Sequence, residues 1–195
     1  MVGHEIAALR RALTAPRPAV AAGSGVAAAV LVPLFERAGA LHVLFTTRSA
    51  ALPVHAGEVA FPGGRHAPGL DATLLATALR ETTEEIGIAA RDVDVLGALD
   101  PISTFSSNFT IAPFVGTIPD AYDFVLDARE VDDVFSLPLA VLLDPATTVV
   151  ESWTFGDRTV PVTSYRHDGR TIWGATQRIT ASLCDLVLAI RAAVD

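Results

Sequence analysis

The chain contains no lysine, because all 14 of its basic residues are arginines. This absence excludes a Schiff-base lysine and the lysine of a P-loop nucleotide site. The net charge of −8 also argues against nonspecific binding to nucleic acid or to an anionic membrane. We therefore expect a small-molecule ligand, and an anionic one would need a local cation.

Cysteine is nearly absent as well. Cys184 is the single one, which excludes an internal disulfide and suits a reducing compartment. It lies in the apolar helical pattern SLCDLVLAI, so we expect a buried core residue. No signal-peptide pattern opens the chain, and the apolar run VAAAVLVPLF is too short to span a bilayer. The prediction is a soluble cytoplasmic protein.

The 195 residues are enough for one folded domain, and 51% of them are hydrophobic. Residues 1–22 are expected to form a helix over 4–14 followed by a Pro/Gly/Ala linker. Residues 23–195 are expected to form a single domain that ends in a helix over 174–194. Expected strands lie near 26–35, 41–48, 93–98, 109–118, 147–155, 159–166 and 170–173, with a short strand in GEVAFPGG that runs into a glycine turn. A short helix is expected after Pro138.

Strands and helices alternate irregularly along the chain and include hairpins. This pattern predicts the α/β (α+β) class, with a mixed sheet between helices rather than a doubly wound parallel sheet. The clearest helix is expected over 71–86, where Asp71 can cap the start and Gly87 can end it. Its apolar stripe consists of Leu75, Ala78, Leu79, Thr82 and Ile86.

Three glutamates gather near the end of this helix. Glu81, Glu84 and Glu85 lie within an arc of roughly 100° beside the stripe. Each like-charge pair costs roughly 0.2–0.5 kcal/mol, and the helix dipole disfavours anions at this end. A hard divalent cation would offset these penalties, and oxygen-only ligands suit Mg²⁺ or Mn²⁺ rather than zinc. Arg80 is placed to pair with or orient a carboxylate, and a solvated acidic face is the alternative.

The segment GGRHAPGLDATLLATALRETTEEIGI resembles the Nudix box, the signature of enzymes that hydrolyse a nucleoside diphosphate linked to another group. Gly64 begins the box, and its specific half, Arg-Glu-x-x-Glu-Glu-x-Gly, runs from Arg80 to Gly87. The spacing from Gly64 to Arg80 is longer than in the family pattern, and the first glutamate of the pattern is missing around 70–72. The resemblance implies a Nudix fold, a mixed sheet between helices with the box as loop, helix and loop.

The resemblance also implies which residues act. Glu81, Glu84 and Glu85, with the Gly63 carbonyl, would hold Mg²⁺, with Mn²⁺ as an alternative. Arg80, Glu81 and Glu84 are the expected catalytic residues of the box. Metal ions can clamp phosphates and lower the pKa of a bound water, so direct attack by water on phosphorus is the expected mechanism.

Nudix enzymes often use a further glutamate outside the box as base or metal ligand. The segment REVDDVF offers Glu130, Asp132 and Asp133. We favour Glu130, because it matches the start of a similar segment in the subfamily named below. A polar loop without a catalytic role is the alternative.

The segment before the box, LFTTRSAALPVHAGEVAFPGG, is similar to the corresponding segment of coenzyme A pyrophosphatases. Matching positions run from Thr46 to Pro62, and TIAPFVG and IWGAT are similar to later segments of that subfamily. This likeness implies coenzyme A or acyl-CoA as substrate, cut to a phosphopantetheine and adenosine 3′,5′-bisphosphate. Pro53 replaces an arginine of the pattern and Glu58 replaces its glutamine, so ADP-ribose, NADH and a (d)NTP stay alternative substrates.

Arg48, His55, Gly64 and Arg65 are the expected substrate-binding residues. Arg48 is favoured, because it is expected to end a strand and to point toward the box. For each of the arginine and histidine side chains, a structural role is the alternative. Trp173 would stack on a ligand or fill the core. A nucleotide-sensing module without catalysis is the alternative from another class, and a homodimer through the first or last helix is compatible with the sequence.

Overall fold

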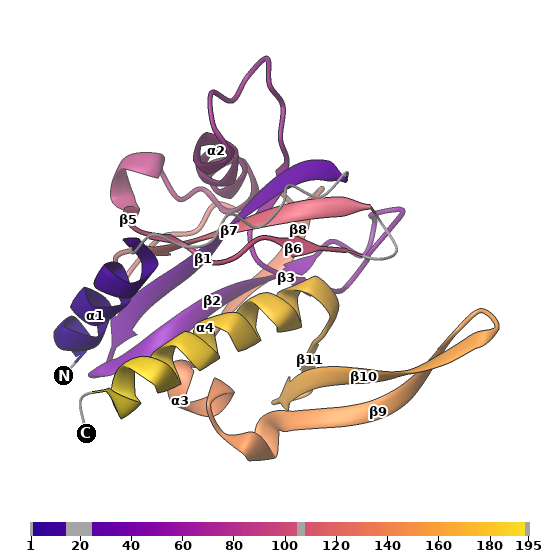
Figure 1. The fold of residues 1–195 in the computed structure, drawn as a ribbon. Helices are drawn as coiled ribbons and strands as arrows, with labels where there is room; N and C mark the ends of the chain where they lie inside the picture. The colour runs from indigo at the N-terminus through magenta and orange to yellow at the C-terminus, as the bar shows by residue number, and fades with distance from the viewer. Residues whose placement is uncertain (1, 15–24, 105–107, 194–195) are drawn as a thin grey trace.

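The computed structural model describes residues 2–14, 25–104 and 108–193, and within them the chain forms an eight-stranded mixed sheet, a three-stranded sheet and flanking helices (Figure 1). The linker predicted up to residue 22 lies outside the described residues from 15 onward. The larger sheet contains β1 (Val26–Arg37), β2 (Ala40–Arg48), β3 (Val59–Ala60), β4 (Gly63–Arg65), β5 (Asp94–Ala98), β6 (Ile102–Ser103), β7 (Phe109–Thr117) and β8 (Val131–Pro138). The smaller sheet contains β9 (Thr148–Phe155), β10 (Arg158–His167) and β11 (Arg170–Ile172). The helices are α1 (Val2–Thr14), α2 (Leu74–Ile86), α3 (Leu139–Leu142) and α4 (Gly174–Ala192), with 3₁₀ turns η1 (Ala90–Asp92) and η2 (Pro145–Thr147).

The central strand of the larger sheet is β1, and the order runs β3-β2-β1-β7-β5. β1 pairs with β7 in parallel and with β2 and β4 antiparallel, so the predicted mixed sheet is confirmed. β2 and β4 share one edge of β1: β2 pairs with its last residues, and β4 pairs with Ala28, Ala29 and Val30 near its start. This division brings the glycines of β4 beside the middle of the sheet.

Helices cover both faces of the sheet, with α2 on one face and α1 and α4 on the other (Figure 1). Successive side chains of a strand point to opposite faces, and β1 and β2 are buried on both. On the face toward α1 and α4, the strand residues Val32, Leu34 and Val43 form one core with Leu9 of α1 and Leu183 of α4. On the opposite face, Ala78 of α2 packs with Ala29, and Ile86 packs with Phe35 and Leu44.

The helix α2 begins later than the sequence predicted. Its N-cap is Thr73, whose side chain accepts a hydrogen bond from the Ala76 amide, so the prediction that Asp71 caps the helix is wrong. Gly87 ends the helix in the left-handed conformation, as predicted. The buried face includes Ala78 and Ile86 of the predicted stripe, but it also includes Glu85.

Two further predictions differ from the structure. The glycine turn predicted in GEVAFPGG is instead the strand β4, because Gly63 and Gly64 pair with β1. The segment with Asp132 and Asp133, considered as a polar loop, begins the strand β8, which pairs with β2. The sequence signal for β8 was weak, because two adjacent aspartates interrupt its apolar pattern.

The prediction of a buried Cys184 and the predicted first helix are confirmed. Cys184 is buried in the core, and burial raises the pKa of its thiol to about 11. α1 joins the main core through Leu9 and Leu13, which are 0% and 5% exposed. Among the described residues, no helix combines the length and apolar character needed to cross a membrane.

Candidate active site

Two consecutive glycines of β4 each face one glutamate of α2. The Gly63 amide donates a hydrogen bond to Oε2 of Glu85 at 3.0 Å. A Cβ on Gly64 would lie 2.5 Å from Cδ of Glu81, so that carboxylate rests directly against the Gly64 backbone. The structure therefore brings together both halves of the segment that the sequence analysis singled out.

Only glycine fits at position 63, because of the backbone conformation there and the atoms that surround it. Its φ is +149°, and a Cβ would lie 2.3 Å from the Ala29 carbonyl oxygen of β1. A side chain there would collide with the central strand, whereas the nearest atoms to one on Gly64 would be those of the Glu81 carboxylate. The two glycines thus serve different purposes: Gly63 permits strand pairing, and Gly64 leaves room for a carboxylate.

Glu85 carries the most perturbed carboxyl group of the acidic helix. The residue is only 4% exposed, and burial raises its pKa to about 8, against the hydrogen bond from Gly63, which lowers it. The negative charge of Glu130 raises this pKa further, whereas Arg48 lowers it. Burial also raises the pKa of Glu81 above its ordinary value. Both carboxylates therefore lie in surroundings that disfavour negative charge.

Arg80 draws together the charged groups on one side of α2. Its Nη2 donates to Oε1 of Glu81 at 2.7 Å, and its Nη1 donates to Oε2 of Glu84 at 2.9 Å. Its Nε and Nη2 donate to the two oxygens of Asp71 at 2.8 and 3.0 Å. The prediction that Arg80 pairs with a carboxylate is confirmed, and three carboxylates share it.

Asp71 is a residue of this site that the sequence analysis did not assign to it. Its side chain is 2% exposed, and it accepts hydrogen bonds from Arg80, from the Thr77 hydroxyl at 2.9 Å and from the Ala67 amide at 3.2 Å. The hydrogen bonds from Arg80 are the main reason that its pKa lies well below the ordinary value. Its position beside the missing first glutamate of the box was the signal that could have found it.

The carboxylates of the site differ in how firmly they are held. The Glu84 side chain is 58% exposed, so its pair with Arg80 is weak and can break at little cost. The Glu81 side chain is only 16% exposed. Since Asp71 binds Arg80 independently, the guanidinium stays in place when Glu84 turns away.

Two residues from other segments reach the same carboxylates. Glu130 is exposed, yet its charge acts on both Glu81 and Glu85, so it lies at the edge of the cluster. Arg48 ends β2, as predicted, and its charge acts on Glu85. Its Nε is buried and has no hydrogen-bond partner among the described residues. Burying a guanidinium nitrogen without a hydrogen-bond partner costs free energy.

The other predicted substrate contacts lie farther out. His55 is exposed in the left-handed conformation, and its Nδ1 lies 3.1 Å from the carboxylate of Glu58. Arg65 is exposed at the end of β4. The described contacts do not tie either side chain to the glutamates of α2.

The side-chain atoms near Glu85 that could bind a metal are mainly carboxylate oxygens, and these are the ligands that a hard divalent cation prefers. Burial outweighs the charge of Arg48 and keeps the pKa of Glu85 near 8, and a bound cation would add to that positive charge. Among the described residues, no three His, Cys, Asp or Glu side chains already converge as a metal centre. Arg80 holds Glu81 and Glu84 instead, so a cation would have to draw the exposed Glu84 away from it.

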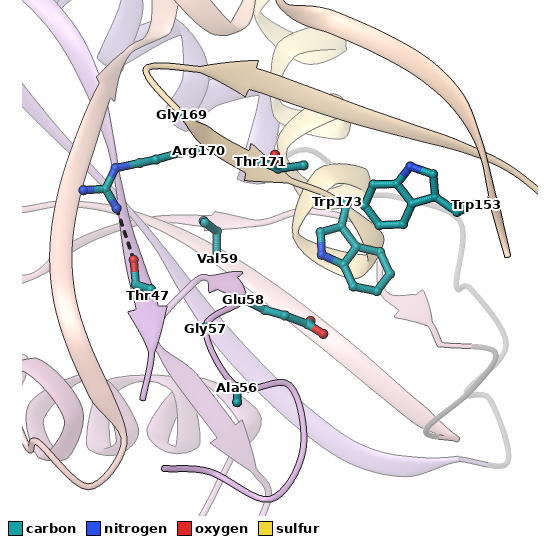
Figure 2. A pocket seen from close by; sticks show the side chains of 10 residues that line it. All are labelled: Thr47, Ala56, Gly57, Glu58, Val59, Trp153, Gly169, Arg170, Thr171 and Trp173. Atoms are coloured by element: carbon teal, nitrogen blue, oxygen red, sulfur yellow. Dashed lines mark hydrogen bonds between the residues drawn. The ribbon is translucent and has the colours of Figure 1, made fainter. Parts of the chain in front are cut away.

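A hollow of about 430 Å³ opens near the end of β2, on the side of the smaller sheet (Figure 2). Thr47, Glu58, Arg170 and both tryptophans of the chain line it. Trp173 is half-buried directly before α4, beside Trp153, so it is neither a fully buried core residue nor a contact of the acidic cluster.

Comparisons with known proteins place the chain in a family. The NUDIX domain family matches residues 25–153. The uncharacterized Nudix hydrolase NudL of Yersinia enterocolitica is 43% identical over 127 residues, or 65% of this chain. The chain spans 64% of the length of that relative.

Two further proteins are similar. The peroxisomal coenzyme A diphosphatase NUDT7 of Mus musculus is 41% identical over 116 residues, which are 60% of this chain and 48% of that protein. The crystal structure of RenU, a Nudix hydrolase from M. smegmatis, superimposes with a TM-score of 0.54 at 17% identity, covering 87% of this chain and 88% of that one. The last likeness concerns the fold alone.

Proposed function

The chain belongs to the Nudix family, and we propose that it hydrolyses the phosphoanhydride of a nucleoside diphosphate linked to another group. The observation that carries this proposal is the contact of Gly63 and Gly64 with Glu85 and Glu81. This contact places two carboxylates with raised pKa values directly against the backbone of two glycines. A residue with a side chain at either position would collide with its neighbours. Such a site favours a cation and, through it, a phosphate.

We propose coenzyme A or acyl-CoA as the substrate. Support comes from the segment LFTTRSAALPVHAGEVAFPGG and from the mouse relative that is named a coenzyme A diphosphatase. The products would be a phosphopantetheine and adenosine 3′,5′-bisphosphate. Pro53 and Glu58, which depart from the coenzyme A pattern, favour ADP-ribose, NADH or a (d)NTP as the second candidate.

In this proposal Glu81, Glu84 and Glu85, with the Gly63 carbonyl, hold Mg²⁺ or Mn²⁺. When bound, the cation supplies charge neutralisation at the phosphates and lowers the pKa of water. Glu84 is free to turn toward the cation, because its pair with Arg80 is exposed.

The other charged residues act on the substrate. Arg48 offers its unpartnered buried Nε to a phosphate oxygen, and a guanidinium suits that geometry. Glu130, exposed beside the cluster, takes up the proton of the attacking water as general base. Arg80 stays bound to Asp71 and orients Glu81.

A substrate panel tests the reaction. Coenzyme A, ADP-ribose, NADH and dNTPs are each incubated with Mg²⁺ and with EDTA, and the products are separated by chromatography. Coenzyme A is expected to be cleaved with Mg²⁺ and to stay intact with EDTA. Glu84→Gln and Glu85→Gln should each lower kcat by orders of magnitude while the chain stays folded. Glu36→Gln is the matched control, because Glu36 is exposed near the end of β1 and, as the neighbour of Phe35, points to the face of the sheet opposite the one that packs with Ile86 of α2.

Each other outcome has a definite meaning. If ADP-ribose is cleaved and coenzyme A is not, the coenzyme A assignment is wrong. If no compound is cleaved but a nucleotide binds, the chain is a nucleotide-sensing module. The predictions of a homodimer and of a cytoplasmic location stay predictions, and size-exclusion chromatography with light scattering tests the first.

A further inference from the structure

Both tryptophans of the chain line one hollow, which we call the tryptophan hollow. It measures about 430 Å³ and lies between the segment Ala56–Val59 and the smaller sheet (Figure 2). This volume is within the range of sites that hold small molecules. The reaction proposed above takes place at the glutamates of α2 and leaves the hollow without a role.

The aromatic wall of the tryptophan hollow offers flat, accessible rings. The ring centroids of Trp153 and Trp173 lie 5.1 Å apart, and Phe155 stacks against Trp173 at 6.1 Å. Neither tryptophan is fully buried, and Phe155 is 46% exposed. Clustered aromatic rings that stay accessible are suited to stacking on a planar ligand.

The charged side chains of the hollow are turned in opposite directions. Arg170 points away from the tryptophans: it donates to the Thr47 hydroxyl at 3.2 Å and to Asp133 at 2.7 Å, and its guanidinium lies 3.8 Å from the Phe135 ring centroid. Glu58 extends on the side of Trp173 (Figure 2). Its carboxylate accepts from His55 and retains free lone pairs, so the charged group left for a ligand is an acceptor.

The tryptophan hollow adjoins the proposed phosphate contact. Thr47 lines the hollow, and the next residue of β2 is Arg48, with its unpartnered Nε and its charge acting on Glu85. The Gly57 amide of the hollow's rim donates to the Arg48 carbonyl at 3.0 Å. Successive side chains of a strand point to opposite faces, so Thr47 faces the hollow and Arg48 faces the glutamates of α2. Arg48 is the last residue of β2, so a substrate with a phosphate at Arg48 would reach the hollow around this end of the strand, past Gly57.

We infer that the tryptophan hollow binds the base of the nucleotide substrate, a planar heteroaromatic ring that bears an exocyclic amino group. The base stacks on Trp173 and contacts Trp153 at its edge, because the two indole planes are inclined by 53°, and its amino group donates to Glu58. A keto group in place of the amino group would turn an acceptor toward the carboxylate, which selects against it. This inference rests on the proposed function, because it assumes a nucleotide substrate.

Intrinsic fluorescence tests the inference directly, because every tryptophan of the chain lines the hollow. The probes are AMP and IMP, which differ in the amino or keto group of the base and contain no phosphoanhydride. Titrations are made in EDTA, so neither hydrolysis nor metal contributes. AMP is expected to change the emission saturably and to bind at least about fivefold more tightly than IMP.

Three variants separate stacking from recognition of the amino group. Glu58→Gln is expected to remove most of the preference for AMP, because an amide can donate as well as accept. Trp153→Leu and Trp173→Leu are each expected to weaken AMP binding about fivefold or more, with the remaining tryptophan as reporter. Trp153→Leu is informative even if Trp173→Leu, directly before α4, fails to fold. Glu36→Gln is again the control.

The inference is overturned if AMP leaves the emission unchanged at millimolar concentration, if AMP and IMP bind equally, or if a folded tryptophan variant binds AMP as well as the wild type. Failure here is distinguishable from failure of the proposed function. Hydrolysis without AMP binding in the hollow refutes only the base site, whereas AMP binding without hydrolysis of any phosphoanhydride refutes only the reaction.

Discussion

Replacing Glu85 by glutamine is expected to stabilise the metal-free protein against unfolding at pH 8 and to lower the kcat of hydrolysis. The wild-type carboxyl group is 4% exposed, and burial raises its pKa to about 8 from an ordinary value of 4.5. Glutamine has nearly the same shape and keeps an oxygen that can accept the Gly63 amide. The substitution therefore removes a buried titratable group, and with it the cost of keeping that group protonated, with little change in packing.

The size of the effect follows from the pKa difference. The folded protein keeps the Glu85 proton up to about pH 8, whereas the unfolded chain loses it near pH 4.5. Because the folded state binds more protons in this window, the free energy of unfolding falls as pH rises through it. The loss is about 1.4 kcal/mol per pH unit, or about 4 kcal/mol between pH 5 and pH 8.

Urea unfolding of the wild type and Glu85→Gln in EDTA at pH 5, 6, 7 and 8 measures this difference. The advantage of the variant is expected to grow with pH across the series. Added Mg²⁺ is expected to stabilise the wild type more than the variant, since a cation binds the ionised carboxylate. Parallel pH profiles in EDTA would refute the argument from burial, and wild-type kcat in the variant would remove Glu85 from the site.

Four further predictions concern other parts of the site and fold. Gly63→Ala is expected to destabilise the chain by about 3 kcal/mol or more in urea unfolding, because its Cβ would meet the Ala29 carbonyl at 2.3 Å. Gly64→Ala, which displaces only the end of Glu81, is expected to keep a normal Tm and lower kcat roughly 100-fold; a normal kcat would contradict this contact. Asp71→Ala leaves Arg80 without its buried partner, so both Tm and kcat should fall, and an unchanged Tm would show that the network does not stabilise the fold. Leu9→Ala removes a fully buried side chain of α1 and should cost about 2–5 kcal/mol of stability, with kcat unchanged well below Tm.

Much of the fold was predictable because local patterns agree with the final structure. The hairpin of β1 and β2, the helix α4 and the end of α2 at Gly87 follow from alternation, helical spacing and a left-handed glycine. β8 was not predictable in the same way. Its Asp132 and Asp133 interrupt the apolar pattern, and pairing with β2, far away in sequence, is what makes it a strand.

The candidate site shows the same division. The grouping of Glu81, Glu84 and Glu85 with Arg80 was evident from spacing on one helix. The role of Asp71 was not, because its contact with Arg80 depends on the turn that starts at Ala67 and on the later helix start at Thr73. Sequence spacing alone favoured a cap at Asp71, whereas the fold buries its carboxylate.

The sequence by itself determined the family resemblance and the acidic helix, since both depend on residues close together in the chain, and its irregular alternation of strands and helices predicted a mixed sheet. Only the tertiary structure decided which glutamate is buried. Glu85 and Glu84 are neighbours in sequence, yet β4 covers one and leaves the other 58% exposed. Tertiary packing likewise gathered Trp153, Trp173 and Glu58 around one hollow. Burial, electrostatic environment and cavities arise from segments that meet in space, and no local pattern encodes which segments these will be.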